Sequence, residues 1–193
     1  DLCALDLAYG SFAARDQARP HTDAFVGMLP PKLARIMINL SGANSGTVLD
    51  PFCGTGVVLQ EALIDGFTVS GTDLSDKMVD YTTKNLAWFV DKKHPRGTIG
   101  PVYQADAMTG QWQQPISAVV SETYLGQPFS APPRAEKLVQ VRGNCNHIIT
   151  AFLNNIHPQL KSGTPLCLAV PTWRNNSGQF THLPLINDLS RLG

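Results

Sequence analysis

Three aspartates follow three successive short apolar segments of the chain: Asp50, Asp73 and Asp106. The first opens the turn sequence D-P-F-C-G-T-G of residues 50–56, in which Gly54 and Gly56 form a G-x-G pair. Glycines at such a turn let the backbone bend sharply and approach a ligand closely. An acidic group beside that turn suits a ligand with positive charge or amino groups, and S-adenosylmethionine carries both a sulfonium and an ammonium group. The pattern therefore indicates a binding site for this methyl donor.

Two other nucleotide-binding motifs do not fit this turn. A dinucleotide site has the pattern G-x-G-x-x-G, and no third glycine follows Gly56 at the required spacing. A P-loop ends in Gly-Lys-Ser/Thr, which the turn lacks. For the methyl donor, a carboxylate at Asp73 can accept both hydroxyls of a ribose. Asp106, after the third segment, is placed to meet an adenine amino group.

These acidic residues must be positioned by strands and helices that alternate along the chain. Strands are expected at residues 47–50, 67–72, 102–104, 116–120 and 165–170. Helices are expected at residues 31–40, 57–63, 76–89 (with Ser75 as N-cap), 134–141, 147–156 and 185–192, and a loop at residues 91–100. Such alternation predicts an α/β fold with a mostly parallel sheet and helices on both faces. Ligands bind at the carboxyl ends of such strands, where the three aspartates and the pair Ser121 and Glu122 fall.

The composition bounds the class of protein. The 193 residues include 15 basic and 15 acidic side chains, and 43% are hydrophobic, which excludes a disordered tail, a collagen-like repeat and a coiled coil and predicts one domain. The zero net charge argues against a protein that holds nucleic acid by bulk attraction. The four cysteines have no C-x-x-C spacing, so no zinc site is indicated and reduced thiols in the cytoplasm are expected. No apolar run of about 18 residues is present, so no membrane span is expected.

The turn and the segment before it resemble a known family. Residues 50–56, together with M-L-P-P-K-L-A-R-I-M-I-N-L at residues 28–40, look like the RNA methylase family, which includes archaeal-type tRNA guanosine N2-methyltransferases and is related to the N6-adenine DNA methylases. The resemblance implies a Rossmann-like class I S-adenosylmethionine-dependent methyltransferase domain over residues 1–193, with residues 1–28 as an N-terminal extension. It also implies the donor-binding residues: Asp50, Gly54 and Gly56 at the methionine end, Phe52 in the same turn, Asp73 at the ribose and Asp106 at the adenine edge.

The sequence departs from that family where the catalytic tetrad D-P-P-Y is expected, since residues 121–124 read S-E-T-Y. An exocyclic amine of a base is a poor nucleophile, so acceptors that bind its N–H groups and an aromatic ring that stacks on the base favour its attack on a methyl group. Tyr124 can supply the stacking ring. Ser121 stands at the family's acidic position with only a hydroxyl, and Glu122 can supply the missing carboxylate. The catalytic residues are therefore predicted to be Ser121, Glu122 and Tyr124.

The expected function is methyl transfer from S-adenosylmethionine to an exocyclic amine of a nucleobase, with guanine N2 of tRNA as the favoured target. N6-adenine methylation of DNA is the alternative reaction, because the donor turn is shared. A donor-binding scaffold without catalysis is the alternative from another class, because the tetrad is altered. The family's seven-stranded fold implies that a C-terminal strand pair is missing. The resemblance also implies an RNA-binding domain of the THUMP type elsewhere in a longer polypeptide.

Other chemically capable residues carry weaker hypotheses. Cys53 lies inside the turn, where a small buried thiol is expected rather than a nucleophile. The histidines have no metal-ligand spacing, so no metal is expected. Lys92, Lys93, His94 and Arg96 are expected to form a solvated basic loop, and Arg15, Arg19 and Arg35 to be scattered without a nucleic-acid footprint.

Overall fold

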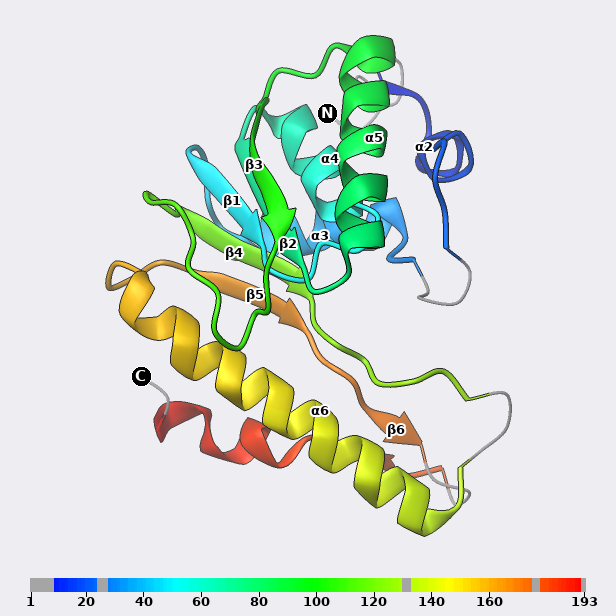
Figure 1. Ribbon diagram of the computed structural model, residues 1–193, viewed down its shortest axis with the longest axis vertical. Helices are drawn as coiled ribbons and strands as arrows, with labels where there is room; N and C mark the ends of the chain where they lie inside the picture. The colour runs from blue at the N-terminus through cyan, green and yellow to red at the C-terminus, as the bar shows by residue number, and fades with distance from the viewer. Residues whose placement is uncertain (1–8, 24–27, 130–132, 175–177, 192–193) are drawn as a thin grey trace.

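The main sheet of the protein has five parallel strands. The computed structural model describes residues 9–23, 28–129, 133–174 and 178–191. The strands are β1 (Thr47–Asp50), β2 (Thr68–Asp73), β3 (Thr98–Gln104), β4 (Ala118–Glu122) and β5 (Leu166–Ala169), in the spatial order β3-β2-β1-β4-β5 (Figure 1). The strand order reverses between β1 and β4, and such a switch point opens a crevice at the carboxyl ends of the strands. The predicted parallel α/β architecture is confirmed.

Helices cover both faces of this sheet (Figure 1). They are α2 (Phe12–Gln17), α3 (Pro31–Ser41), α4 (Val57–Asp65), α5 (Asp76–Lys93) and α6 (Ala135–Ile156), with the short 3-10 helices η1 (His157–Gln159) and η2 (Pro184–Arg191). Because alternate residues of a strand point to opposite faces, Val48 packs in the core beneath α3, α4 and α5. Leu49 packs on the other face, against Phe152 and Ile156 of α6. Among the described residues, no helix is long and apolar enough to cross a membrane.

The helix boundaries follow from proline and glycine positions. Helix α3 begins at Pro31 after an extended Pro30, because a proline in the first turn sacrifices no helical hydrogen bond. It ends at Ser41, and its C-cap Gly42 has a left-handed φ of 70°, which suits a residue without Cβ. Ser75 is the N-cap of α5, as expected, although its side chain makes no capping bond. Instead, the carboxylate of Asp73 accepts the backbone N–H of Ser75 at 2.9 Å.

Four predicted segments are corrected by the structure. The loop expected at residues 91–100 is restricted to residues 94–97, because α5 continues to Lys93 and β3 begins at Thr98. The two helices expected at 134–141 and 147–156 form one helix of 22 residues, since the solvent-facing Gly143 costs only about 1 kcal/mol and does not break it. The final helix is the 3-10 helix η2. A hairpin of β6 (Trp173–Arg174) and β7 (Phe180–Thr181) was not predicted.

Helix α2 is fixed to α4 by a buried ion pair. Of the predicted N-terminal extension, residues 1–8 and 24–27 lie outside the described residues. Arg15 of α2 donates from Nε to the Oε1 of Glu61 in α4 at 2.7 Å, and both side chains are 2% exposed. The Nη2 of Arg35 in α3 lies 3.4 Å from the Oε2 of the same carboxylate. Burial nevertheless raises the pKa of Glu61, so desolvation of this carboxyl exceeds the opposing effect of the two arginines. The three helices therefore meet at Glu61.

We expect Arg15→Met to lower the free energy of unfolding by about 3–5 kcal/mol, because it leaves the carboxylate of Glu61 buried with one partner fewer. The matched control is Lys84→Met, which removes an exposed ion pair to Asp80 one helical turn away and should cost at most about 0.5 kcal/mol. Urea denaturation of both variants measures the difference. Equal losses would show that the Arg15–Glu61 pair does not anchor α2.

Candidate functional site

A cavity of about 750 Å³ opens at the carboxyl ends of β1, β2 and β4. Seven of the predicted site residues line it: Asp50, Phe52, Gly54, Asp73, Asp106, Glu122 and Tyr124. The other two predicted site residues, Gly56 and Ser121, do not line it. The strand ends thus bring together residues that are distributed from position 50 to position 124 of the sequence.

The glycine turn adopts a backbone that only glycine takes readily. Gly54 has a φ of 52° and Gly56 a φ of 84°, both left-handed. The turn is closed by the N–H of Gly56, which donates to the carbonyl of Cys53 at 2.7 Å, and Gly56 then caps α4. A Cβ at Gly56 would lie 3.0 Å from the Cγ2 of Thr82. The second glycine therefore allows the turn to pack closely against α5.

Two polar side chains of α5 hold the turn, and neither was predicted from the sequence. Thr82 donates its hydroxyl to the carbonyl of Gly54 at 2.7 Å. Asn85 donates its amide to the carbonyls of Thr55 and His21, each at 2.9 Å, and accepts the N–H of His21 at 3.0 Å. Both side chains are fully buried. The sequence held one signal for these two residues: they are polar side chains on the inward-facing side of a predicted helix whose other inward residues are apolar.

Asp73 combines a structural role with a free face toward the cavity. Its carboxylate accepts the N–H of Gly54 at 3.0 Å and the N–H of Ser75 at 2.9 Å. Two carboxylate oxygens have about four lone-pair sites, so acceptor capacity for ligand hydroxyls remains. Burial raises the pKa of Asp73, and the two N–H groups oppose that rise. The residue thus links the glycine turn to the start of α5 at the cavity wall.

Asp106 lies at the start of a tight turn after β3. Its Oδ1 accepts the N–H of Met108 at 2.9 Å, and its carbonyl accepts the N–H groups of Thr109 and Gly110. This turn places the aspartate, Ala107 and Met108 on the cavity wall. The predicted adenine-edge position is therefore within the same cavity as the glycine turn.

Asp50 is the most strongly perturbed acid of the cavity. Burial raises its pKa to about 7, against the opposing hydrogen bonds from Ser121 and from the N–H of Phe52, and the nearby charges of Asp73 and Glu122 raise it further. The hydroxyl of Ser121 donates to the Oδ1 of Asp50 at 2.6 Å, and Ser121 is fully buried. Its observed contact is therefore with Asp50, and Ser121 itself does not line the cavity. A direct role of Ser121 toward a substrate stays a prediction.

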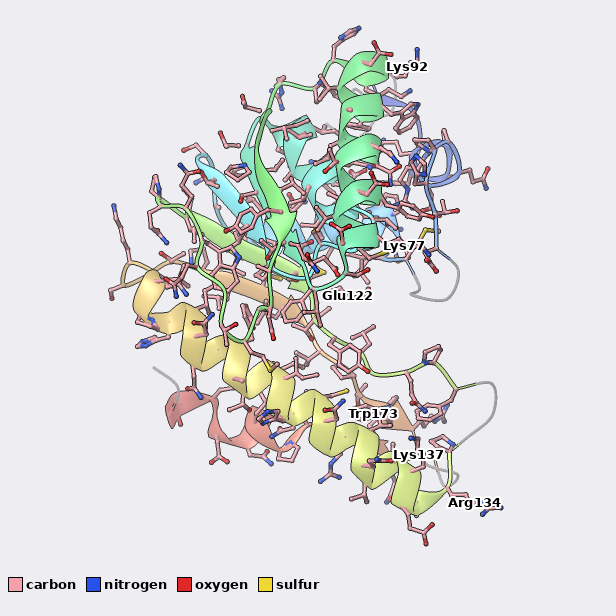
Figure 2. The ribbon with its side chains drawn as sticks, in the orientation of Figure 1. Lys77, Lys92, Glu122, Arg134, Lys137 and Trp173 are labelled. Atoms are coloured by element: carbon pink, nitrogen blue, oxygen red, sulfur yellow. The ribbon has the colours of Figure 1, made fainter. Side chains whose placement is uncertain are left out.

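Glu122 and Tyr124 face the cavity from the end of β4, and Figure 2 marks Glu122 where the sheet meets the loop toward α6. Between them, Thr123 bonds the carbonyl of Ala169 through both its N–H, at 3.0 Å, and its hydroxyl, at 2.9 Å. Residues two apart in an extended segment share a side, so this pairing presents both neighbours to the cavity. It fixes the backbone where the family has prolines. The carboxylate of Glu122 makes no hydrogen bond to the described part of the chain, and burial raises its pKa.

The remaining candidates have structural surroundings. Cys53 is buried, and its burial raises the pKa of the thiol well above the usual range, so a neutral thiol is present as expected. No cluster of three potential metal ligands occurs among the described residues. Lys92 and Lys93 belong to the last turn of α5 rather than to a loop. The arginines expected to be scattered are instead buried together around α4 and the glycine turn: Arg15, Arg19 and Arg35.

Comparisons with known proteins agree with this geometry. Residues 11–84 match a family model described as DNA methylase. The chain is 37% identical over 160 residues to the tRNA (guanine(10)-N2)-dimethyltransferase of Methanothermobacter thermautotrophicus, covering 81% of this chain and 43% of that protein. It is 32% identical over 127 residues to the enzyme of the same name from Methanocaldococcus jannaschii, covering 63% and 36%. The chain therefore spans less than half the length of these curated relatives.

Solved structures share the fold at low sequence identity. The glycopeptide N-methyltransferase MtfA matches with a TM-score of 0.55 at 17% identity, covering 84% of this chain and 78% of that one. The same enzyme complexed with sinefungin matches with a TM-score of 0.51 at 20% identity, covering 76% and 51%. The fold is that of the class I S-adenosylmethionine-dependent methyltransferases. By sequence, the chain is similar to the tRNA (guanine(10)-N2)-dimethyltransferases and, over residues 11–84, to the DNA methylase family.

We expect Gly56→Ala to destabilise the protein more than Gly42→Ala. Both glycines are left-handed, so each substitution carries a backbone cost of about 1–2 kcal/mol. Nothing lies within 4 Å of a Cβ at Gly42, whereas a Cβ at Gly56 would press on the buried Thr82 and add about 1–3 kcal/mol. Chemical denaturation of the two variants makes the comparison, and equal losses would refute the close packing of the turn on α5.

Proposed function

We propose that this chain is the catalytic domain of an S-adenosylmethionine-dependent methyltransferase that modifies guanine N2 in RNA, with tRNA as the substrate. The observation that carries the proposal is the convergence of three strand-end acids, a G-x-G turn and the Glu122–Tyr124 pair on one cavity. Catalysis in the cytoplasm and an RNA-binding domain elsewhere in the full-length protein belong to the same proposal. The similarity to curated tRNA methyltransferases over 160 residues supports it.

The donor fits the chemistry of the cavity wall. When bound, S-adenosylmethionine supplies an electrophilic methyl group on a positively charged sulfur. Asp50 and the glycine turn offer negative charge and close backbone approach to its methionine end. Asp73 offers acceptors for ribose hydroxyls, and Asp106 an acceptor for the adenine amino group. A cavity of about 750 Å³ is in the usual size range of small-molecule sites and has room for a base beside the donor.

The acceptor side favours guanine over adenine. Guanine presents two adjacent donors, N1–H and the N2 amine, and the two oxygens of Glu122 can accept one hydrogen bond from each. Adenine presents an acceptor at N1 beside its N6 amine, so a carboxylate there would face a lone pair. Tyr124, which is 38% exposed, is available to stack on the base. Glu122 is also placed to take the proton that the amine loses when it is methylated.

Donor affinity should rise with pH because of Asp50. With a pKa of about 7, this carboxyl is mostly neutral at pH 6 and mostly charged at pH 8. A cationic donor prefers the charged form, so the Kd of S-adenosylmethionine, measured by calorimetry, should fall up to about tenfold over that range. Asp50→Asn should flatten most of this dependence.

The same ionisation acts on stability with the opposite sign in the absence of donor. The folded pKa of Asp50 exceeds that of the unfolded chain, so its contribution to stability is present at low pH and is lost as the pH rises through about 7. The gain in the free energy of unfolding that Asp50→Asn gives the ligand-free protein should therefore be larger at pH 8 than at pH 5.

A Kd of S-adenosylmethionine that is identical at pH 6 and pH 8 would contradict the assigned role of Asp50 at the donor.

Glu122→Gln should lower turnover on guanine about 10²–10³-fold, because it replaces one acceptor with a donor that opposes the N–H groups. Donor affinity should stay nearly unchanged. Glu136→Gln, at an exposed position of α6, is the matched control and should retain full activity. Turnover is measured by methyl transfer to unmodified tRNA, followed by mass spectrometry of its nucleosides.

Three outcomes separate the candidate functions. Formation of N2-methylguanosine supports the proposal, and formation of N6-methyladenine in DNA would replace it with the alternative reaction. Donor binding without any methyl transfer would indicate a donor-binding scaffold. Wild-type turnover by Glu122→Gln would move the acceptor role to Ser121 or to backbone carbonyls.

A further inference from the structure

Charge is divided unevenly between the two parts of the chain, although the whole is neutral. Residues 1–122 contain 9 basic and 13 acidic side chains, whereas residues 123–193 contain 6 basic and 2 acidic ones. The C-terminal part therefore carries an excess of four positive charges and the N-terminal part an excess of four negative ones. Such asymmetry is typical of proteins that contact nucleic acid with one region.

Four of the C-terminal cations gather at one end of the molecule. Arg134 and Lys137 stand at the start of α6, and Arg142 follows two turns later. Arg174 lies on the β6–β7 hairpin, whose Trp173 packs against the cluster that contains Val141 of α6. Figure 2 shows Arg134, Lys137 and Trp173 at this end, far from Lys92 at the opposite end. We name this set of cations, together with Phe180, the basic lobe.

The cations of the basic lobe differ from the others in their partners. Six of the nine basic residues before position 123 form ion pairs with carboxylates: Arg15, Arg19, Arg35, Lys77, Lys84 and Lys92. None of the four in the lobe has a carboxylate partner in the described ranges, although Arg174 donates to the carbonyl of Gly178 and Lys137 to the side-chain carbonyl of Gln140. Their charge is therefore not neutralised within those ranges.

An exposed aromatic ring stands beside one of these cations. In the β6–β7 hairpin, Arg174 is paired directly with Phe180, so the two side chains share one face. Phe180 is 62% exposed, and Arg174 is exposed as well. A cation beside an exposed ring offers both a phosphate contact and a surface on which a base can stack.

The basic lobe is continuous with the proposed base-binding side of the cavity. Asn144 and Ile148 of α6 line the cavity. Lys137 precedes Asn144 by seven residues, so it lies on the same helical face roughly 10 Å further along. A strand whose base enters between Tyr124 and Glu122 would thus have its flanking phosphates directed along α6 toward the lobe.

We propose that the basic lobe binds the phosphodiester backbone of the RNA next to the target guanine. The proposal rests on the proposed function for the identity of the nucleic acid, but no residue of the lobe lines the cavity itself. Arg134, Lys137, Arg142 and Arg174 contact phosphates, and Phe180 stacks on a flanking base. The chain thereby carries an RNA-binding surface of its own despite its zero net charge.

The test compares two fourfold variants of this chain. The lobe variant replaces its four cations with glutamine: Arg134→Gln, Lys137→Gln, Arg142→Gln and Arg174→Gln. The matched variant removes the same charge from the N-terminal part: Lys32→Gln, Lys84→Gln, Lys92→Gln and Lys93→Gln. Binding to fluorescein-labelled unmodified tRNA is measured by anisotropy between 50 and 200 mM salt, and donor binding is measured by calorimetry.

We expect the lobe variant to bind the tRNA at least about tenfold more weakly, with a salt slope shallower by about 0.7–0.9 for each phosphate that its side chains no longer neutralise. The matched variant should bind the tRNA less than about twofold more weakly, and both variants should bind the donor like wild type. Exchanging charge for charge, with Arg134→Lys and Lys137→Arg, should preserve most of the affinity. Phe180→Ala should weaken binding without changing the salt slope.

Equal weakening in the lobe and matched variants would overturn the proposal, as would a wild-type chain that binds no tRNA. Failure of the proposed function has a different signature. If the lobe variant fails to bind tRNA while wild type binds it but transfers no methyl group, the lobe is supported and the proposed reaction is wrong. If methyl transfer to RNA occurs with the same KM in wild type and lobe variant, the reaction is supported and the lobe is overturned.

Discussion

The parallel pairing of β1 with both β2 and β4 is the constraint on which the rest of the structure depends. A parallel strand must be followed by a crossover, and the crossovers that leave β1 and β4 cover opposite faces of the sheet. In such sheets the crevice between them leaves strand-end side chains uncovered by a helix. Asp73 and Glu122 are only partly buried by their own chain for this reason. A ligand in the crevice would complete their surroundings.

The electrostatics of that crevice follow from the same arrangement. Parallel strands that end together bring their terminal acids together, so the charges of Asp73 and Glu122 oppose the ionisation of Asp50 in the ligand-free protein. The N–H of Phe52 and the hydroxyl of Ser121 donate to Asp50 and offset part of this cost, but neither group neutralises the charge. The cavity is therefore electrostatically unfavourable when empty and suited to a ligand that brings positive charge.

The sequence predicted the parts of the molecule that depend on local patterns, whereas those that depend on distant partners were not predicted. The D-P-F-C-G-T-G turn, the proline at the start of α3 and the first apolar strand are local signals, and the structure has each of them where expected. Asn85 could not be assigned from the sequence, because its partners lie 30 and 64 residues away. The convergence of three arginines around α4 and the glycine turn was also hidden, since buried ion pairs have no sequence period. The continuity of α6 was not predicted either, because Gly143 weakens the helical pattern at its middle even though its energetic cost is small.

Asn85 recognises only backbone atoms, namely the carbonyls of Thr55 and His21 and the N–H of His21. The side chains at positions 21 and 55 are not part of this contact, so mutational drift at those two positions leaves it intact. Asn85 itself has no equivalent substitute: aspartate has no N–H to donate, and glutamine is one methylene too long for a fully buried site. Substitutions at His21 and Thr55 therefore leave these hydrogen bonds in place, whereas α5 must keep an asparagine at position 85 to form them.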